Sequence, residues 1–174
     1  MEKIKGLAPT SSIIVISGGV AESAANTFTQ EQIDLQLNAL DNEVFVVTAI
    51  DMNLSPPDYD GNRSTSTRGS LSTTTRTALG TISVSSVMAE ARDDIVVDEI
   101  QGNPNGVAFS RMAGETPATN LPYLAIIATN DFFAQVQGSN NANAKNLTFR
   151  LWGYRARASA AQYSALVQSE ILSA

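Results

Sequence analysis

The 174-residue chain contains no cysteine and no histidine. This excludes disulfide bonds, thiol nucleophiles, Ser-His-Asp triads and zinc sites built from the usual ligands. The absence of cysteine leaves the redox compartment undecided.

Charged residues are also scarce, at 16%, and the net charge is −6. The only cations in the first sixty residues are Lys3 and Lys5, so there is no basic arm to neutralise phosphates and we expect no strong direct nucleic-acid binding. Serine and threonine are abundant instead. A surface of hydroxyl groups repels its own copies weakly, which suits a protein that packs against its neighbours, although strand surfaces without a partner remain an equal alternative.

Long hydrophobic runs are missing as well. No run approaches the roughly eighteen apolar residues of a transmembrane helix, so we predict no membrane span. Near the N-terminus, Ile13–Ile16 is too short for the apolar core of a signal peptide, and Pro9 interrupts the approach to it. We interpret residues 1–12 as an N-terminal arm that is followed by a short strand.

The central part of the chain shows the pattern of β-strands. Apolar residues alternate with polar ones within Thr27–Leu40, while Glu43–Asn53 is apolar on both faces, and together they predict a hairpin from about 29 to 53. Ser64–Thr77 is nearly all serine, threonine and arginine, which predicts a strand at an edge, over a surface or in a subunit contact. Thr81–Ala89 predicts a further strand.

The densest aromatic stretch is Leu121–Arg157, which holds six of the eleven aromatic residues. It predicts two long strands joined by a Gly/Ser/Asn/Ala loop, as a hairpin from about Tyr123 to Ala158. The apolar pattern changes phase near Gly153, which indicates a β-bulge there.

The final segment changes to a helical period. Ser159 and Gln162 fit a capping box, and one face then carries Tyr163, Leu166, Val167 and Ile171. We predict a C-terminal amphipathic helix at 159–174, which packs on its own domain or docks on a neighbour. The whole is an all-β fold of about eight strands, with one sandwich domain at 13–158.

Two acidic segments are candidate sites. Asp58, Asp60 and Asn62 alternate around a glycine, as the ligands of calcium loops do, although other expected ligands are missing and a surface turn explains them too. A possible structural calcium is the one cofactor that we consider. The acids within 90–99 could supply paired carboxylates for glycoside hydrolysis, but no aromatic wall stands near them, so we predict that the chain is not an enzyme.

Charge is distributed unevenly along the chain, since acids gather in 90–99 while residues 61–89 and 132–169 contain none. This predicts complementary patches between identical subunits, with pairing inside one chain as the alternative. Arginines beside Trp152 and Tyr154 could also stack on single-stranded nucleic acid. The candidate interface residues are Arg68, Arg76, Asp93, Asp94, Asp98, Arg150, Trp152, Arg155, Arg157, Leu166 and Ile171.

The segment 132–158, FFAQVQGSNNANAKNLTFRLWGYRARA, resembles the closing strands of single jelly-roll viral capsid proteins of tailless or archaeal-type viruses. The resemblance implies a jelly-roll β-sandwich of two four-stranded sheets, self-assembly into pentamers or hexamers, location in the virion, contacts with other virion proteins and no catalytic residues. The missing basic arm departs from many small capsid proteins, and it favours a genome that is condensed by other proteins or enclosed by a membrane, or a minor capsid role.

Two alternatives remain open at the level of sequence. One is a β-sandwich component of another surface assembly, such as a phage tail or fibre or a cell-surface layer. The other is a carbohydrate-binding module, which would need exposed aromatic side chains, for which Trp152, Tyr154 and Tyr59 are the candidates.

Overall fold

The computed structural model describes residues 4–100, 103–111 and 121–172, with the backbone alone for 98–100, 103–108, 110 and 111. These residues form β-strands, a short 3-10 helix at Ala39–Asp41 and one α-helix, α1, at Ala160–Leu172. The strands are β1 (Leu7–Pro9), β2 (Ile14–Ala21), β3 (Thr29–Asp34), β4 (Glu43–Leu54), β5 (Thr65–Ser72), β6 (Val87–Ile100), β7 (Asn103–Arg111), β8 (Ala125–Ile127), β9 (Asp131–Ser139) and β10 (Asn146–Ala158).

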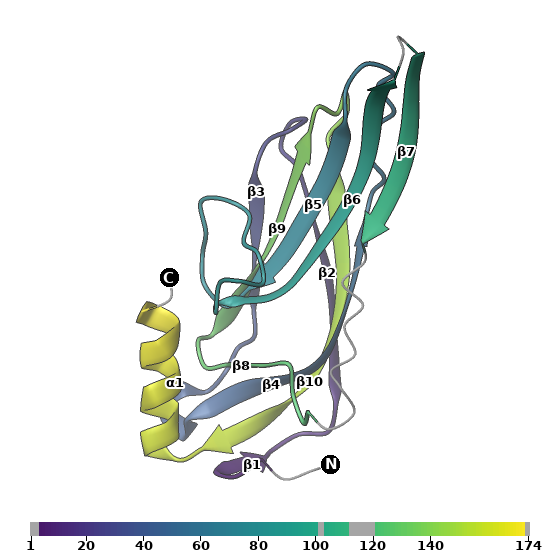
Figure 1. Cartoon of the computed structure of the whole chain (residues 1–174). Helices are drawn as coiled ribbons and strands as arrows, with labels where there is room; N and C mark the ends of the chain where they lie inside the picture. The colour runs from purple at the N-terminus through teal and green to yellow at the C-terminus, as the bar shows by residue number, and fades with distance from the viewer. Residues whose placement is uncertain (1–3, 101–102, 112–120, 173–174) are drawn as a thin grey trace.

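The strands make two antiparallel sheets that face each other (Figure 1). Sheet A has the order β2-β10-β4-β8, and β1 also pairs with the end of β10. Sheet B has the order β3-β9-β5-β6-β7. Leu7–Pro9, which lies inside the segment predicted as an arm, is thus a strand of the described fold. The predicted all-β sandwich with a C-terminal helix is confirmed.

Eight of the strands follow the order of a jelly roll. Leaving β1 and β7 aside, the first strand pairs with the last, the second with the seventh, the third with the sixth and the fourth with the fifth. The predicted hairpins at 29–53 and 123–158 are therefore wrong, because β3 and β4 lie in opposite sheets, as do β9 and β10. Alternation of apolar residues shows which face of a strand is buried but not which strand pairs with it.

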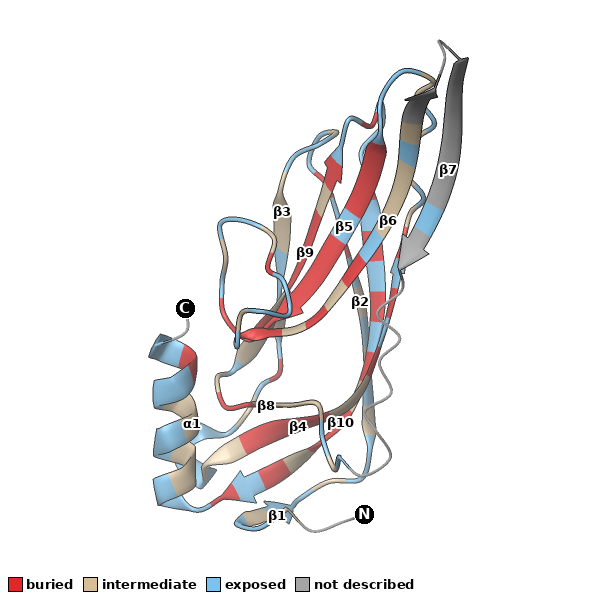
Figure 2. Cartoon of the chain, viewed as in Figure 1, coloured by how far each residue is buried: buried red, intermediate tan, exposed pale blue. Residues whose placement is uncertain are grey.

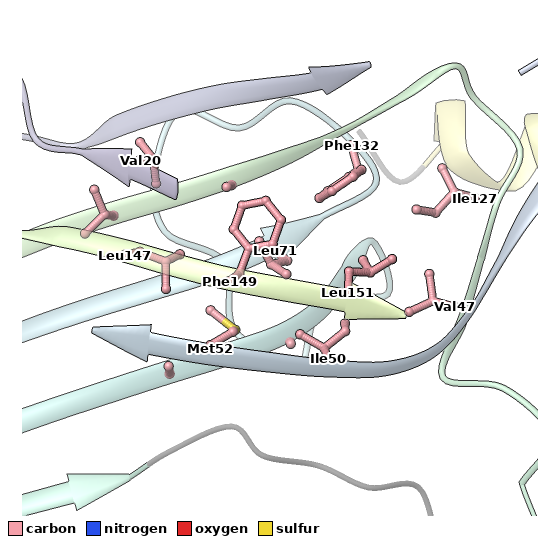
Figure 3. Close-up of a cluster of buried hydrophobic side chains, with 14 of the residues drawn as sticks. Val20, Val47, Ile50, Met52, Leu71, Ile127, Phe132, Leu147, Phe149 and Leu151 are labelled. Atoms are coloured by element: carbon pink, nitrogen blue, oxygen red, sulfur yellow. The ribbon is translucent and has the colours of Figure 1, made fainter. Parts of the chain in front are cut away.

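The main core fills the space between the sheets (Figures 2 and 3). The rings of Phe132 from sheet B and Phe149 from sheet A meet edge to face, with centroids 5.7 Å apart. Leu147 and Leu151 flank Phe149 on the same face of β10, and all three are buried. The aromatic stretch of the sequence is therefore the place where the sheets join.

A second cluster lies on the opposite face of sheet A, beneath α1. Trp152 pairs with Ala49 but Gly153 pairs with Val47, so Thr48 is the extra residue of a bulge, as predicted near Gly153. On one side of the bulge the apolar residues of β10 face sheet B, and on the other Tyr154 faces α1. The change of phase thus marks where the covered face of the strand changes.

The Ser/Thr-rich strand β5 is central in sheet B and mostly buried, so its predicted place at an edge or surface is wrong. On its outer face, Ser70 donates a hydrogen bond to Gln135 Oε1 (2.8 Å), and Gln135 Nε2 donates to Ser72 Oγ (2.7 Å). The predicted strand at Thr81–Ala89 is also wrong in most of its length, because β6 begins at Val87 and turns precede it.

Helix α1 confirms the predicted C-terminal helix. Gln162 N donates to Ser159 Oγ (3.4 Å), as a serine N-cap requires. Tyr163, Leu166 and Val167 pack on the second cluster, and Glu170 continues this face as a buried residue. Within the described residues, no helix is both long and apolar enough to cross a membrane.

Candidate functional site

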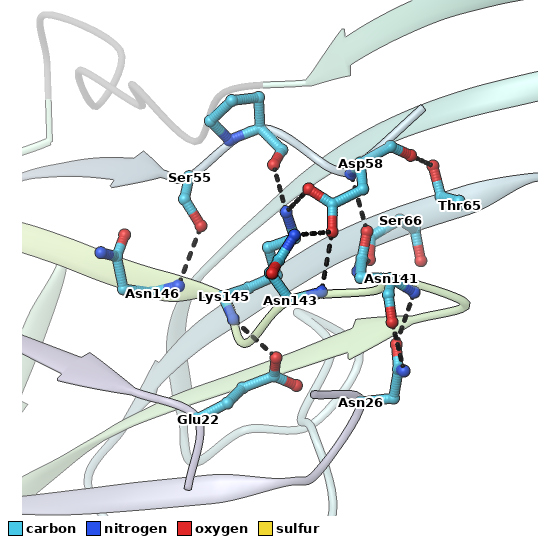
Figure 4. Close-up of polar contacts among 11 residues, drawn as sticks. Glu22, Asn26, Ser55, Asp58, Thr65, Ser66, Asn141, Asn143, Lys145 and Asn146 are labelled. Carbon is cyan, nitrogen blue, oxygen red and sulfur yellow. Dashed lines mark hydrogen bonds and ion pairs between the residues drawn. The ribbon is translucent and has the colours of Figure 1, made fainter. Parts of the chain in front are cut away.

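The end of the sandwich opposite α1 is closed by polar side chains from three connections (Figure 4). Glu22 and Asn26 lie between β2 and β3, Asp58 lies between β4 and β5, and Asn141 and Lys145 lie between β9 and β10. We call these five residues the loop cluster. They bring together segments that are more than a hundred residues apart in the chain.

Lys145 is the charge at the centre of the loop cluster, and its side chain is only 6% exposed. Its Nζ donates to Asp58 Oδ1 (2.6 Å) and to the carbonyl oxygen of Pro56 (2.9 Å). The other oxygen of Asp58 accepts from the backbone N–H of Asn143 (2.9 Å). The Lys145 ammonium, aided by the Asn143 N–H, lowers the pKa of Asp58 to about 2.

The two other members with buried side chains hold the β9–β10 connection. Glu22 accepts the backbone N–H groups of Gly138 (2.6 Å) and Lys145 (2.7 Å). Asn141 donates to the carbonyl oxygen of Ser66 (2.8 Å), accepts from the N–H of Asp58 (2.9 Å), and exchanges two hydrogen bonds with Asn26. The buried polar groups therefore position backbone, and the loops form one connected unit.

The predicted calcium ligands face different partners. Asp58 binds Lys145, whereas Asp60 accepts from the N–H of Asn62 (3.0 Å) and forms an ion pair with Arg63 (2.8 Å). These contacts, the Asn62 N–H first, lower the pKa of Asp60. In the part of the chain that the structure describes, no three acidic side chains gather around a point where a metal ion could sit. The calcium loop stays a prediction.

Two predicted interface arginines are bound within the chain. Arg155 forms an ion pair with Glu43 (3.1 Å) and donates to the carbonyl oxygens of Leu35 (2.8 Å) and Gln36 (3.1 Å). Arg157 forms an ion pair with Asp41 (3.0 Å). Both arginines thus hold the connection between β3 and β4 in place. Pairing inside one chain was the alternative to a subunit contact for these residues.

The remaining aromatic candidates lie in different surroundings. Arg150 is exposed, and its guanidinium lies over the ring of Trp152 at 5.9 Å from the centroid. Tyr154 is buried beneath α1, and this burial raises its pKa. Tyr154 therefore cannot offer an exposed platform for a sugar or a base, whereas Tyr59 is exposed.

The candidates of sheet B lie on the neighbouring strands β5 and β6 and on the connection between them. Arg68 is exposed on β5, while Arg76 is half-buried in the β5–β6 connection and donates to the carbonyl oxygen of Ala78 (3.3 Å). Asp93 and Asp94 are half-buried on β6, and Asp94 forms an ion pair with Arg92. The side chain of Asp98 lies outside the described residues.

The two helix candidates have opposite surroundings. Leu166 is half-buried against the second cluster, whereas Ile171 is exposed, so Ile171 does not share the packed face predicted for it. The buried position one turn later belongs to Glu170, whose two oxygens accept the N–H groups of Ala128 (3.0 Å) and Thr129 (2.9 Å). Burial raises the pKa of Glu170.

Large apolar side chains are exposed along both lateral edges of the sandwich. At the edge formed by β2, Ile13 is 55% exposed and Val15 is 51% exposed. At the opposite side, Phe109 of the edge strand β7 is 59% exposed, and Val96 of the neighbouring strand β6 is 42% exposed. Among the described strands, β2 pairs only with β10 and β7 only with β6, so each edge also presents free backbone groups.

Comparison with known proteins gives a likeness to solved structures alone. No family model and no curated protein matches the chain. A solved structure from desmodium yellow mottle tymovirus is similar over 92% of this chain and 95% of that chain, with 9% sequence identity and a TM-score of 0.30. The architecture described above therefore rests on the strand pairing alone.

Several residues of these sites carry no signal in the sequence. Glu22 lies in a short polar segment, and Val15 and Phe109 are ordinary apolar residues of their strands. Lys145 could have been noticed, because it is the only lysine after residue 5 in a chain that otherwise uses arginine. That choice fits a compact point charge with several donors in a closed polar pocket.

Proposed function

We propose that this chain is a structural, non-enzymatic subunit that assembles with copies of itself into a closed shell, as a capsid protein does in a virion. The observation that carries the proposal is the pair of opposite edges with exposed apolar side chains. The edge of Ile13 and Val15 lies across the sandwich from the edge strand β7, which carries Phe109 beside Val96 of β6.

Opposite edges favour a head-to-tail contact, in which the β2 edge of one copy meets the β7 edge of the next. Such a heterologous contact generates rings when the rotation closes, and rings of five or six are the units of a shell. A contact between two identical edges would instead stop at a dimer.

Other features support a structural role. The jelly-roll order occurs in capsid proteins as well as in lectin domains and cupins. The buried charges Glu22, Lys145 and Glu170 each hold backbone groups, so they stiffen the subunit. A rigid subunit loses little conformational freedom when its edges meet copies of itself.

The direction of the contact can be tested by mixing two variants. Val15→Asp places a charge on one edge and Phe109→Asp on the other, so each variant alone should stay monomeric in sedimentation velocity, while wild type forms larger species. An equimolar mixture should form a dimer and nothing larger, because it retains one intact pair of edges. Leu40→Asp changes an apolar residue that is 96% exposed elsewhere and should assemble like wild type.

The sedimentation results distinguish a monomer, a head-to-tail assembly and a dimer formed through identical edges. A wild-type chain that stays monomeric over a wide range of concentration and salt would contradict the proposal. If Phe109→Asp still dimerised alone, or if the mixture formed no dimer, the head-to-tail contact would be wrong. Electron microscopy of the wild-type assembly then distinguishes closed shells from fibres or flat layers.

A further inference from the structure

Three arginines occupy one row across sheet B. In the strand register, Arg68 on β5 lies opposite Arg92 on β6, and Arg92 lies opposite Arg111 on β7. On the other side of Arg68, Gln137 of β9 completes the row. Directly opposite residues of antiparallel strands share one face of the sheet, with Cβ atoms about 4.5–5.5 Å apart.

The row lies on the outer face of sheet B. Ala89 and Ala91 of β6 belong to the main core, so Arg92, which follows Ala91, faces outward. Arg68 is exposed on β5, whereas Leu71, which faces the other way, is buried in the core. Phe109, which lies opposite Asp94 in the register, shares this face, but Arg68 lies two strands away on β5, and the inference does not depend on the proposed assembly.

Like charges directly opposite one another destabilise a sheet unless something compensates them. Arg92 has a partner in Asp94 on its own strand. The carboxylate of Glu90, also on this face, accepts the N–H of Ile82 (3.0 Å). Within the described residues, no carboxylate lies within ion-pair distance of Arg68. The guanidinium of Arg68 is therefore the charge of the row that is open to an external anion.

A groove of about 530 Å³ adjoins Arg68. Its lining includes Gln137 and Ser139 of β9 and Ala78 and Leu79 of the β5–β6 connection. The groove places an amide, a hydroxyl group and a guanidinium on one side of a space that is large enough for a small polar ligand. Its lining contains no carboxylate, so the charge of Arg68 is unopposed there.

We propose that this groove binds a phosphate group, with Arg68 as the main ligand. A guanidinium binds phosphate through two parallel hydrogen bonds. The phosphate comes from a nucleic-acid strand or from a small phosphate compound, and the same ligands serve either source.

The test measures binding to the full chain by isothermal titration, with pyrophosphate, the oligonucleotide dT10 and a glutamate-rich peptide as separate probes. Arg68→Gln should weaken phosphate binding by about tenfold or more, because a charged bidentate contact is lost. Arg68→Lys, which keeps the charge but loses the paired N–H donors of the guanidinium, should weaken phosphate binding less. Arg150→Gln removes the same charge from sheet A and should change binding by less than about twofold.

Each outcome either supports the phosphate site or overturns it. Pyrophosphate binding that is lost in Arg68→Gln supports a small phosphate ligand, and dT10 binding that is tighter and equally sensitive supports a nucleic-acid strand. The proposal is overturned if neither phosphate probe binds below about 10 mM. It is also overturned if Arg68→Gln binds like wild type, if Arg150→Gln weakens binding equally, or if only the glutamate-rich peptide binds. Chemical shifts of the Arg68 side-chain N–H in the wild type locate the site independently of the variants.

Discussion

The two ends of the sandwich are closed in different ways. At one end, the loop cluster joins three connections through hydrogen bonds and the ion pair of Lys145 with Asp58. At the other end, α1 covers sheet A with Tyr163, Leu166 and Val167, and Glu170 is the one buried acid described in this helix. One closure depends on complete pairing of polar groups, and the other depends mainly on apolar area.

This difference determines how each end should fail. A buried charge that loses its partner retains its desolvation cost, so a single polar change at the loop cluster should be severe. A shortened apolar side chain beneath α1 loses only the free energy of the area that it covered. The two ends can therefore be separated by substitutions of similar size.

The largest effect is expected for Asp58→Asn, which keeps the shape of the side chain but leaves Lys145 buried without a carboxylate. We expect the free energy of unfolding to fall by about 3 kcal/mol, measured by urea denaturation. The control is Asp60→Asn, which removes the exposed ion pair with Arg63 and should lower the free energy of unfolding far less, because solvent screens exposed ion pairs. Equal effects of the two substitutions would show that the loop cluster does not depend on its ion pair.

A smaller effect is expected at the other end from Leu166→Ala, because Leu166 is only half-buried. We expect a loss of about 1–2 kcal/mol, less than for a fully buried leucine. Ile171→Ala removes a side chain of the same size that is 64% exposed, and it should change the free energy of unfolding by less than about 0.5 kcal/mol. If Ile171→Ala cost more, α1 would pack through a different face from the one described.

The smallest expected effect is the change of stability with pH, which has opposite signs at the two ends of the sandwich. The folded pKa of Asp58 is lowered to about 2, so its stabilisation is present above 3.8 and is lost as the pH falls toward 2. The folded pKa of Glu170 is raised by burial and by nearby Asp131, although backbone N–H groups oppose the shift. The stabilisation of the fold by Glu170 is therefore complete below pH 4.5 and is lost as the pH rises through the folded pKa.

Hydrogen exchange followed by NMR should show both signs within one sample. On acidification, protection of the amide of Asn143 should fall below pH 4, whereas protection at Ala128 and Thr129 should rise as Glu170 gains its proton. Glu170→Gln should abolish the rise without altering the fall. A parallel fall of protection at both ends would contradict the assignment of Glu170.

The two closures also differ in how much the sequence could predict. The helix follows from local signals, because the Ser159 cap and the apolar positions at helical spacing lie within thirteen residues. Only its last turn differs, since Glu170 takes the buried position and Ile171 is exposed. The loop cluster has no such period: Glu22 and Lys145 are 123 positions apart, and nothing local connects them.

Strand pairing shows the same limit. Alternation located the strands near β3 and β10, an apolar run on both faces located β4, and the change of phase near Gly153 located the bulge. It could not reveal that consecutive strands lie in opposite sheets, because either pairing buries the same faces. The Ser/Thr composition of β5 indicated an exposed strand, yet Gln135 and the β5–β6 connection cover it with hydrogen bonds.

Among the candidate interface residues, the sequence correctly brought out the unusual number of arginines late in the chain. It could not separate Arg155 and Arg157, which are bound within the chain, from Arg68, which has no ion-pair partner in the described part. The partners Glu43 and Asp41 belong to a distant segment. The register that aligns Arg68 with Arg92 and Arg111 exists only once the sheet is assembled.

The position of β9 and β10 within the two sheets has a consequence for folding during synthesis. β9 joins β3 to β5, and β10 joins both β1 and β2 to β4, although these two strands are synthesised after all the other described strands. Until about residue 158 has emerged, β2 has no partner strand in sheet A. The early strands of the nascent chain therefore stay unpaired until then. A cell that makes this protein has to keep them from pairing with strands of neighbouring nascent chains.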